Sequence, residues 1–109
     1  MGQIILKKPI ETYFRGANTL DGSLLNQCFA EDAVVQDEEQ EYRGVAAILE
    51  WVEETHKKYN HTMEVIAAYE VAEQTEVTAL VTGDFDGSPA NLDFHFTVVN
   101  EKITFLQCG

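Results

Sequence analysis

Phe29-Ala30-Glu31-Asp32-Ala33-Val34-Val35-Gln36-Asp37, followed closely by Tyr42-Arg43-Gly44, is the stretch that decides the fold of this 109-residue chain. Its apolar residues predict a short strand that ends in the carboxylate of Asp37. The segment before it, from Pro9 to Leu20, predicts a separate amphipathic helix that carries Tyr13. The chain therefore presents a phenol and a carboxylate from two neighbouring elements, a pair suited to acid/base chemistry.

Three helices are predicted before residue 60. Pro9 fits the first turn of the first helix, whose apolar stripe is Ile10, Tyr13, Phe14 and Ala17. Turn and capping residues at 21–23 begin a second, shorter helix that closes near Glu31. A brief strand over 33–36 and a polar loop over 37–41 then lead to a third helix from Val45 to Tyr59. Its apolar side consists of Ile48, Trp51, Val52, Thr55 and Tyr59.

From Thr62 onward the apolar period changes to two residues, which predicts strands. These are expected over 62–71, 76–85, 91–99 and 102–108, with turns between them. Helices followed by an antiparallel meander indicate one α+β domain, residues 1–109, in which a strongly curved antiparallel sheet wraps the three N-terminal helices as a cone open at one end. Four apolar residues are left over once the core face is filled, and they are expected to cover a homodimer interface: Ile66, Ala68, Leu80 and Leu106.

Composition excludes several functions. With 7 basic and 19 acidic side chains, the net charge of −12 repels nucleic acid and anionic lipid. No segment has the length and apolar character of a signal peptide or a membrane span, so we expect a cytoplasmic protein. Cys28 and Cys108 are too few for a disulfide framework and suit a reducing compartment. The three histidines form no metal-binding motif and no glycine-rich phosphate loop occurs, so we expect neither a metal nor a cofactor.

The order of these elements, together with residues 29–35 and the Tyr42-Arg43-Gly44 turn, resembles the nuclear transport factor two-like superfamily. The similarity is greatest to its SnoaL-like polyketide cyclase and ketosteroid isomerase branches, and it covers nearly the whole chain. The resemblance implies a cystatin-like α+β barrel, cone-shaped, with an apolar cavity between the sheet and the helices.

The same resemblance assigns candidate catalytic residues. Tyr13 matches the phenol that donates a hydrogen bond to a developing enolate, and Asp37 matches the carboxylate that shuttles the proton. The family's third catalytic group, a protonated acid, corresponds to Phe94 here, and a supporting tyrosine is replaced by Val52. The structural alternatives are that Asp37 only begins a polar turn and that Tyr13 is a core tyrosine with a backbone partner.

Four aromatic residues are expected to line or border the cavity on this fold and to bind the substrate: Phe29, Trp51, Phe94 and Tyr42. The leading hypothesis is a pocket protein that binds a small apolar or carbonyl-bearing ligand and transfers a proton next to the carbonyl. Its main alternative is a non-catalytic ligand-binding or protein-interaction module of the same fold. An accessory domain of a larger oxidoreductase is a third possibility.

Overall fold

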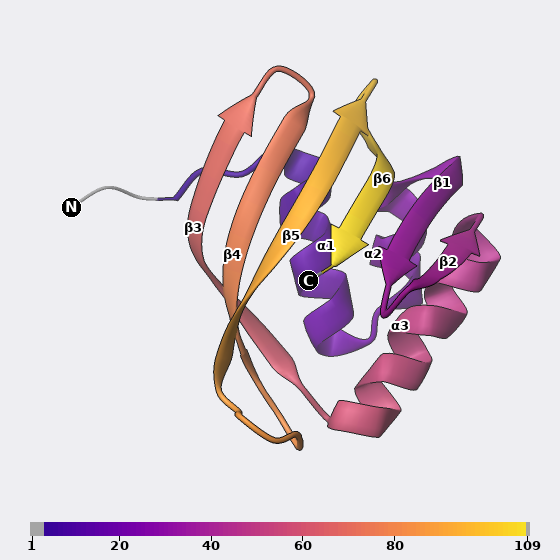
Figure 1. Cartoon of the computed structure of the whole chain (residues 1–109). Coiled ribbons are helices and arrows are strands. Elements are labelled where there is room, and N and C mark those ends of the chain that lie inside the picture. The colour runs from indigo at the N-terminus through magenta and orange to yellow at the C-terminus, as the bar shows by residue number, and fades with distance from the viewer. Residues whose placement is uncertain (1–3, 109) are drawn as a thin grey trace.

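Three helices and six strands make up the domain. In the computed structural model, which describes residues 4–108, the helices are α1 (Lys8–Thr19), α2 (Gly22–Cys28) and α3 (Val45–Tyr59). The strands are β1 (Phe29–Asp37), β2 (Gln40–Arg43), β3 (Thr62–Val71), β4 (Gln74–Thr82), β5 (Ala90–Val99) and β6 (Lys102–Cys108). Figure 1 shows α1 and α2 behind one face of the curved sheet, with α3 beside β1 and β2.

All six strands belong to one sheet, in the order β2-β1-β6-β5-β4-β3. Four of the five neighbouring pairs are antiparallel, and only β1 and β6 run in parallel. The predicted α+β class, with a sheet wrapped around three helices, is therefore confirmed. The sheet is mixed because β1 enters from the helical part of the chain and lies beside the last strand in the same direction. No helix within residues 4–108 is long and apolar enough to cross a lipid bilayer.

Two local predictions next to β1 were wrong. The second helix ends at Cys28 and not near Glu31, because Phe29 is already extended, with ψ at 143°, and pairs with Ile103 of β6. The polar loop predicted over 37–41 is instead a two-residue turn, and residues 40–43 form β2. Both turn residues, Glu38 and Glu39, have positive φ values of 52° and 65°. This tight hairpin fixes where the end of β1 points.

The core lies between the helices and the inner face of the sheet. Its fully buried side chains include Ile10, Leu25, Val35, Ile48, Phe96 and Ile103. Leu106 belongs to this core, which corrects its predicted place on the outer face. A register shift between Thr97 and Val98 in the β5–β6 pairing inserts one residue and turns Leu106 inward. A similar shift between Val65 and Ala67 in β3 leaves Ile66 on the surface.

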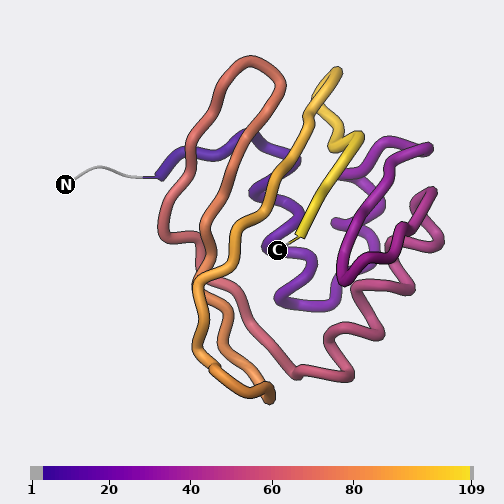
Figure 2. Tube along the Cα trace, viewed as in Figure 1, coloured from indigo at the N-terminus to yellow at the C-terminus, as the bar shows by residue number. Residues whose placement is uncertain are grey.

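Two close contacts connect the helices to the strands at the open end of the cone. The Asn18 side-chain amide donates to the carbonyl of Met63 and accepts from its N–H, both at 2.8 Å, and so fastens α1 to β3. The β4–β5 connection curves toward the end of α3 (Figure 2), where the Asp84 N–H donates to the Tyr59 carbonyl at 2.6 Å. Gly83 permits this approach, because a Cβ there would lie 2.6 Å from the Tyr59 oxygen.

Candidate functional site

A cavity of about 390 Å³ lies between α1, α3 and the inner face of the sheet, and we call it the central cavity. Its deep end is formed by nearly inaccessible side chains, Tyr13, Trp51 and Phe94, whose exposed fractions are 2%, 6% and 4%. Its mouth is formed by more exposed residues at the open end of the cone: Glu38, Tyr59, His61, Phe85, Asp86 and Leu92. The walls are largely apolar, so each polar group on them is a candidate for recognition or chemistry.

Asp37 ends β1 and projects its carboxylate into the central cavity. The Trp51 indole N–H donates to Asp37 Oδ2 at 3.0 Å, which orients the carboxylate from α3. Burial raises the pKa of Asp37 above its ordinary value, the Trp51 hydrogen bond opposes this rise, and the negative charge of Glu38 adds to it. Burial is thus the larger cause of the raised pKa, and the like charge of Glu38 is a smaller one.

Tyr13 reaches the central cavity from α1. Its ring packs edge-on against Phe14, Phe29 and Phe96, with ring centroids 5.1–5.8 Å apart. Burial raises the pKa of Tyr13 well above its usual value, and the nearby Cys108 and Asp37 raise it further. Among the described residues, none hydrogen-bonds the Tyr13 hydroxyl, which therefore stays protonated and is available to donate to a ligand in the cavity.

The four predicted substrate-binding aromatics fall into two groups. Trp51 and Phe94 form part of the cavity wall. Phe29 and Tyr42 do not line it, and each packs behind a residue that does. The Phe29 ring lies 5.8 Å from that of Tyr13, and the Tyr42 ring lies 6.0 Å from that of Trp51. Direct contact of Phe29 or Tyr42 with a substrate stays a prediction, while the geometry gives both a supporting position.

Sequence reasoning missed the residues of the cavity mouth. Tyr59 donates its hydroxyl to Glu38 Oε1 at 3.0 Å, and its ring packs edge-on against His61 and Phe85. These residues come from three separate connections, so no local pattern indicated that they would meet. Burial and the neighbouring His56 lower the pKa of His61, and no described residue hydrogen-bonds its buried Nδ1 atom. His61 is therefore an uncharged wall residue near neutral pH.

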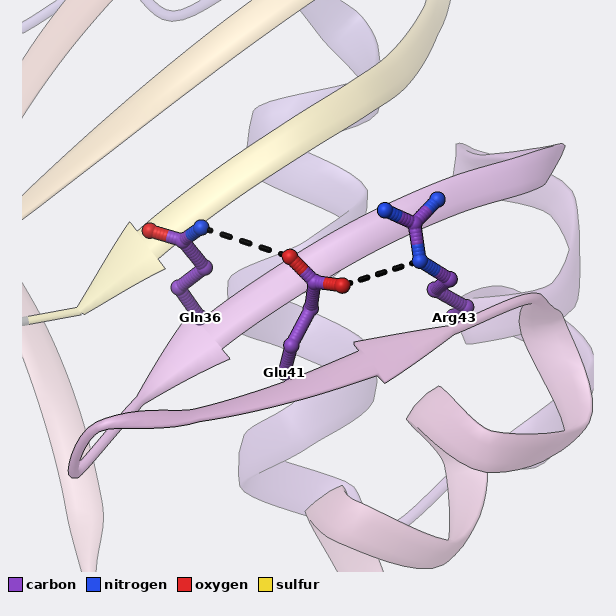
Figure 3. A network of polar contacts seen from close by, with 3 residues as sticks. All are labelled: Gln36, Glu41 and Arg43. Carbon is purple, nitrogen blue, oxygen red and sulfur yellow. Dashed lines mark hydrogen bonds and ion pairs between the residues drawn. The ribbon is translucent and has the colours of Figure 1, made fainter.

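The acidic run 37–41 is divided between two faces of the hairpin. Asp37 and Glu38 line the central cavity, whereas Glu41 lies on the outer side, 2.9 Å from Arg43 Nε and 3.5 Å from Gln36 Nε2 (Figure 3). Because Glu41 is engaged with its own strand pair, it does not contribute to the cavity. The site therefore draws on Asp37 and Glu38 from this run.

The two thiols do not supply a nucleophile. Cys28 and Cys108 are both free, and burial raises the pKa of Cys28 to about 12. Burial also raises the pKa of Cys108 well above its usual value, and the charge of Asp37 adds to that effect. Both thiols thus stay protonated at neutral pH. In the described part of the chain, no three histidine, cysteine or acidic side chains are grouped as a metal ion would require.

Comparisons with known proteins agree with this geometry. The model of the SnoaL-like domain family matches residues 10–105. A Sinorhizobium meliloti protein provisionally named as a polyketide cyclase is 33% identical, with a TM-score of 0.92 and 95% of each chain covered. A comparison with curated proteins gave no match.

Two more distant structures share the fold. One is a Catenulispora acidiphila protein with a ketosteroid isomerase-like fold, solved in complex with trimethylamine; it is 18% identical, with a TM-score of 0.83 and coverage of 96% of this chain and 86% of that one. The other is a nuclear transport factor two-like protein from Cytophaga hutchinsonii, 13% identical, with a TM-score of 0.78 and coverage of 100% and 93%. Together they confirm the predicted superfamily fold.

Proposed function

This chain belongs to the SnoaL-like domain family, and from that premise we propose that its central cavity binds a small apolar, carbonyl-bearing molecule and transfers a proton next to the carbonyl. One observation carries the proposal. A partly buried carboxylate, Asp37, and a phenol that no described residue hydrogen-bonds, Tyr13, project into one largely apolar cavity.

Asp37 is the proposed base. A general base works best when its pKa lies close to the working pH, and burial moves the pKa of Asp37 in that direction. The indole of Trp51 holds the carboxylate in one orientation, so the base does not need to be ordered when the ligand binds. In the proposed reaction Asp37 removes a proton from the carbon beside the carbonyl, which leaves an enolate, and then returns a proton to that carbon or, where the enolate is conjugated with a double bond, to the carbon at the far end of the conjugated system.

Tyr13 is the proposed donor to the oxygen on which negative charge develops. Its raised pKa keeps the proton on the phenol, and its packed ring gives the hydroxyl a fixed position. Phe94 is buried on the cavity wall, and the family resemblance matches it to the second donor of ketosteroid isomerases. A missing donor of this kind typically costs about 3 kcal/mol of transition-state stabilisation, so we propose a slower reaction than in a two-donor site.

Solvent deuterium exchange tests the proposal. The protein is incubated in D₂O with a simple cyclic ketone, and incorporation of deuterium beside the carbonyl is followed by NMR. Asp37→Asn should lower the protein-dependent rate by about 100-fold or more, and Tyr13→Phe by about 10-fold or more. Glu39→Gln is the matched control, because Glu39 lies in the same hairpin but outside the central cavity. Equal rates for the natural protein and Asp37→Asn would contradict the proposal.

Phe94 also supports a second candidate function, a ligand-binding module without catalysis. With an apolar ring at Phe94 in place of an acid, the deep end of the cavity offers a ligand oxygen the phenol of Tyr13 without a second acid beside it. Ligand binding without measurable exchange would favour this alternative.

We further propose that the protein is a cytoplasmic homodimer. Its outer sheet face exposes apolar side chains along the edge strand β3, namely Ile66, Tyr69 and Val71, which a second copy would cover. The two free thiols, Cys28 and Cys108, suit the reducing conditions of the cytoplasm.

A further inference from the structure

The mouth of the central cavity contains a cluster of aromatic rings. Tyr59 packs edge-on against Phe85, with centroids 6.0 Å apart, and against His61, with centroids 6.4 Å apart. All three line the cavity, and they are more exposed than the aromatic residues at its deep end. Ring faces carry partial negative charge and attract cations, most strongly where water is partly excluded.

Two carboxylates line the cavity together with these rings. Glu38 accepts the Tyr59 hydroxyl hydrogen bond at 3.0 Å, and Asp86 follows Phe85 directly in the chain. Among the described residues that line the cavity, none is lysine or arginine, and His61 is uncharged near neutral pH because its pKa is lowered. The mouth therefore has a negative potential, which adds to the field of a chain with net charge −12.

One basic side chain already lies against a ring of the mouth. Lys58, on the exposed side of α3, places its Nζ atom 5.0 Å from the centroid of the Tyr59 ring. It does not line the cavity, so it does not occupy the space in front of Phe85 and Asp86. A ligand cation in the cavity would lie near the same Tyr59 ring and near Glu38, the carboxylate that accepts the Tyr59 hydrogen bond.

We propose that the ligand carries a positively charged amine or quaternary ammonium group, which the mouth holds between Tyr59, Phe85, Glu38 and Asp86. The inference rests on the proposed function in taking the central cavity as the ligand site. The ligand then has two ends, an apolar carbonyl-bearing end at Tyr13 and Asp37, and a cationic end at the mouth. A cavity of about 390 Å³ accommodates a single aromatic ring that carries both groups.

Three para-substituted acetophenones of different charge test this inference, and the cationic and neutral ones also have the same shape. They are 4-acetyl-N,N,N-trimethylanilinium, its neutral isostere 4-tert-butylacetophenone, and the anion 4-acetylbenzoate. Trp51 is the only tryptophan of the chain and lies on the cavity wall, so its single indole N–H signal in a ¹⁵N correlation spectrum reports binding. The cationic probe should bind about 10-fold more tightly than the neutral isostere, and the anion should bind most weakly.

Pairs of matched substitutions show which carboxylates hold the cationic group. Glu38→Gln should weaken binding of the cationic probe by about 3-fold or more and leave the neutral probe within about 2-fold. Glu39→Gln removes the same charge one residue away, outside the cavity, and should have a smaller effect. Asp86→Asn and its control Asp84→Asn form a second pair, because Asp84 is exposed and does not line the cavity. Lys58→Gln should strengthen binding of the cationic probe.

The outcomes separate the two proposals. If the neutral isostere binds as tightly as the cation, or if Glu38→Gln and Glu39→Gln weaken the cation equally, the inference is wrong and the proposed proton-transfer site is unaffected. If none of the three probes shifts the Trp51 signal, the ligand site itself is wrong and the inference fails with it. Tighter binding of the cation, lost selectively with Glu38 or Asp86, supports the inference.

Discussion

At the scale of single residues, Asp37 meets two opposed requirements. Burial disfavours its charged form, yet the proposed chemistry needs that form next to the substrate. The hydrogen bond from Trp51 is the largest of the interactions that stabilise the carboxylate, and a backbone hydrogen bond from Glu38 and the positive charge of Lys58 add to it. Such a residue is favourable for function and unfavourable for folding, a conflict that is common at sites of chemistry.

The conflict at Asp37 predicts that Asp37→Asn raises thermal stability at pH 7. Because the pKa of Asp37 is higher in the folded than in the unfolded chain, its contribution to stability is fully present below the ordinary aspartate pKa and is lost as the pH rises through the folded value. Asparagine carries no charge at any pH and keeps an acceptor oxygen for the Trp51 N–H. Melting curves should show the largest increase in melting temperature of Asp37→Asn over the natural protein near pH 7. This increase should become smaller toward pH 4. A variant that is less stable than the natural protein at pH 7 would refute this prediction.

At the scale of elements, prediction from the sequence succeeded where the signal was local. The bounds of α3 followed from its helical apolar period, and β3 and β6 from alternating side chains and flanking turns. The start of β1 was missed because Phe29 continues the helical spacing of Leu25, and only its pairing with Ile103, far along the chain, makes it extended. The turn at Glu38 and Glu39 was missed because positive φ values usually select glycine or asparagine.

Part of the candidate site was predictable from the sequence and part was not. The family resemblance placed Tyr13 and Asp37, and the structure brings both to one cavity. The mouth was not predictable, because Phe85 lies in the β4–β5 connection, far along the chain from Tyr59 at the end of α3 and His61 just after it. Their meeting depends on the approach of the β4–β5 connection to the end of α3, which is a property of the folded chain.

Because of that approach, Gly83 has no room for a side chain unless neighbouring backbone atoms move. In Gly83→Ala the new Cβ would lie 2.6 Å from the Tyr59 carbonyl oxygen and 2.9 Å from the His61 Cα, both backbone atoms that cannot move freely. The substitution should lower the free energy of unfolding by about 1–3 kcal/mol, measured by urea denaturation. It should also displace the mouth and weaken any ligand that binds there.

Gly22→Ala is the matched control for this substitution. Gly22 begins α2, and a Cβ there meets no atom within 4 Å. Alanine favours helix and reduces the freedom of the unfolded chain, so this variant should be about as stable as the natural protein or slightly more so. Equal losses in both variants would show that the close approach at Gly83 is not the cause.

At the scale of the whole molecule, charge and apolar surface act against each other. A net charge of −12 keeps copies of the chain apart, while Ile66, Tyr69 and Val71 lose contact with water if two copies meet on the outer sheet face. Which of the two prevails depends on ionic strength, since salt screens charge over about 10 Å at 0.1 M and leaves apolar burial intact.

The proposed dimer should therefore tighten as salt increases. Sedimentation velocity at 50 and 500 mM NaCl should show a larger dimer fraction at the higher concentration. Tyr69→Asp, at a side chain that is 70% exposed, should shift the protein to monomer. Leu20→Asp, at an exposed apolar residue that ends α1, is the control and should leave the dimer in place. A monomer at both salt concentrations and high protein concentration would disprove the dimer.

The parallel pairing of β1 with β6 has a consequence for biosynthesis. A ribosome adds about 5–20 residues per second, so the strand that carries Asp37 emerges seconds before residues 102–108. During that interval one edge of β1 has no neighbour, and its backbone N–H and C=O groups on that side have no partner strand. The pocket is thus completed only once β6, which contributes Cys108 to its wall, has been made, and a translation product that stops before β6 would lack it.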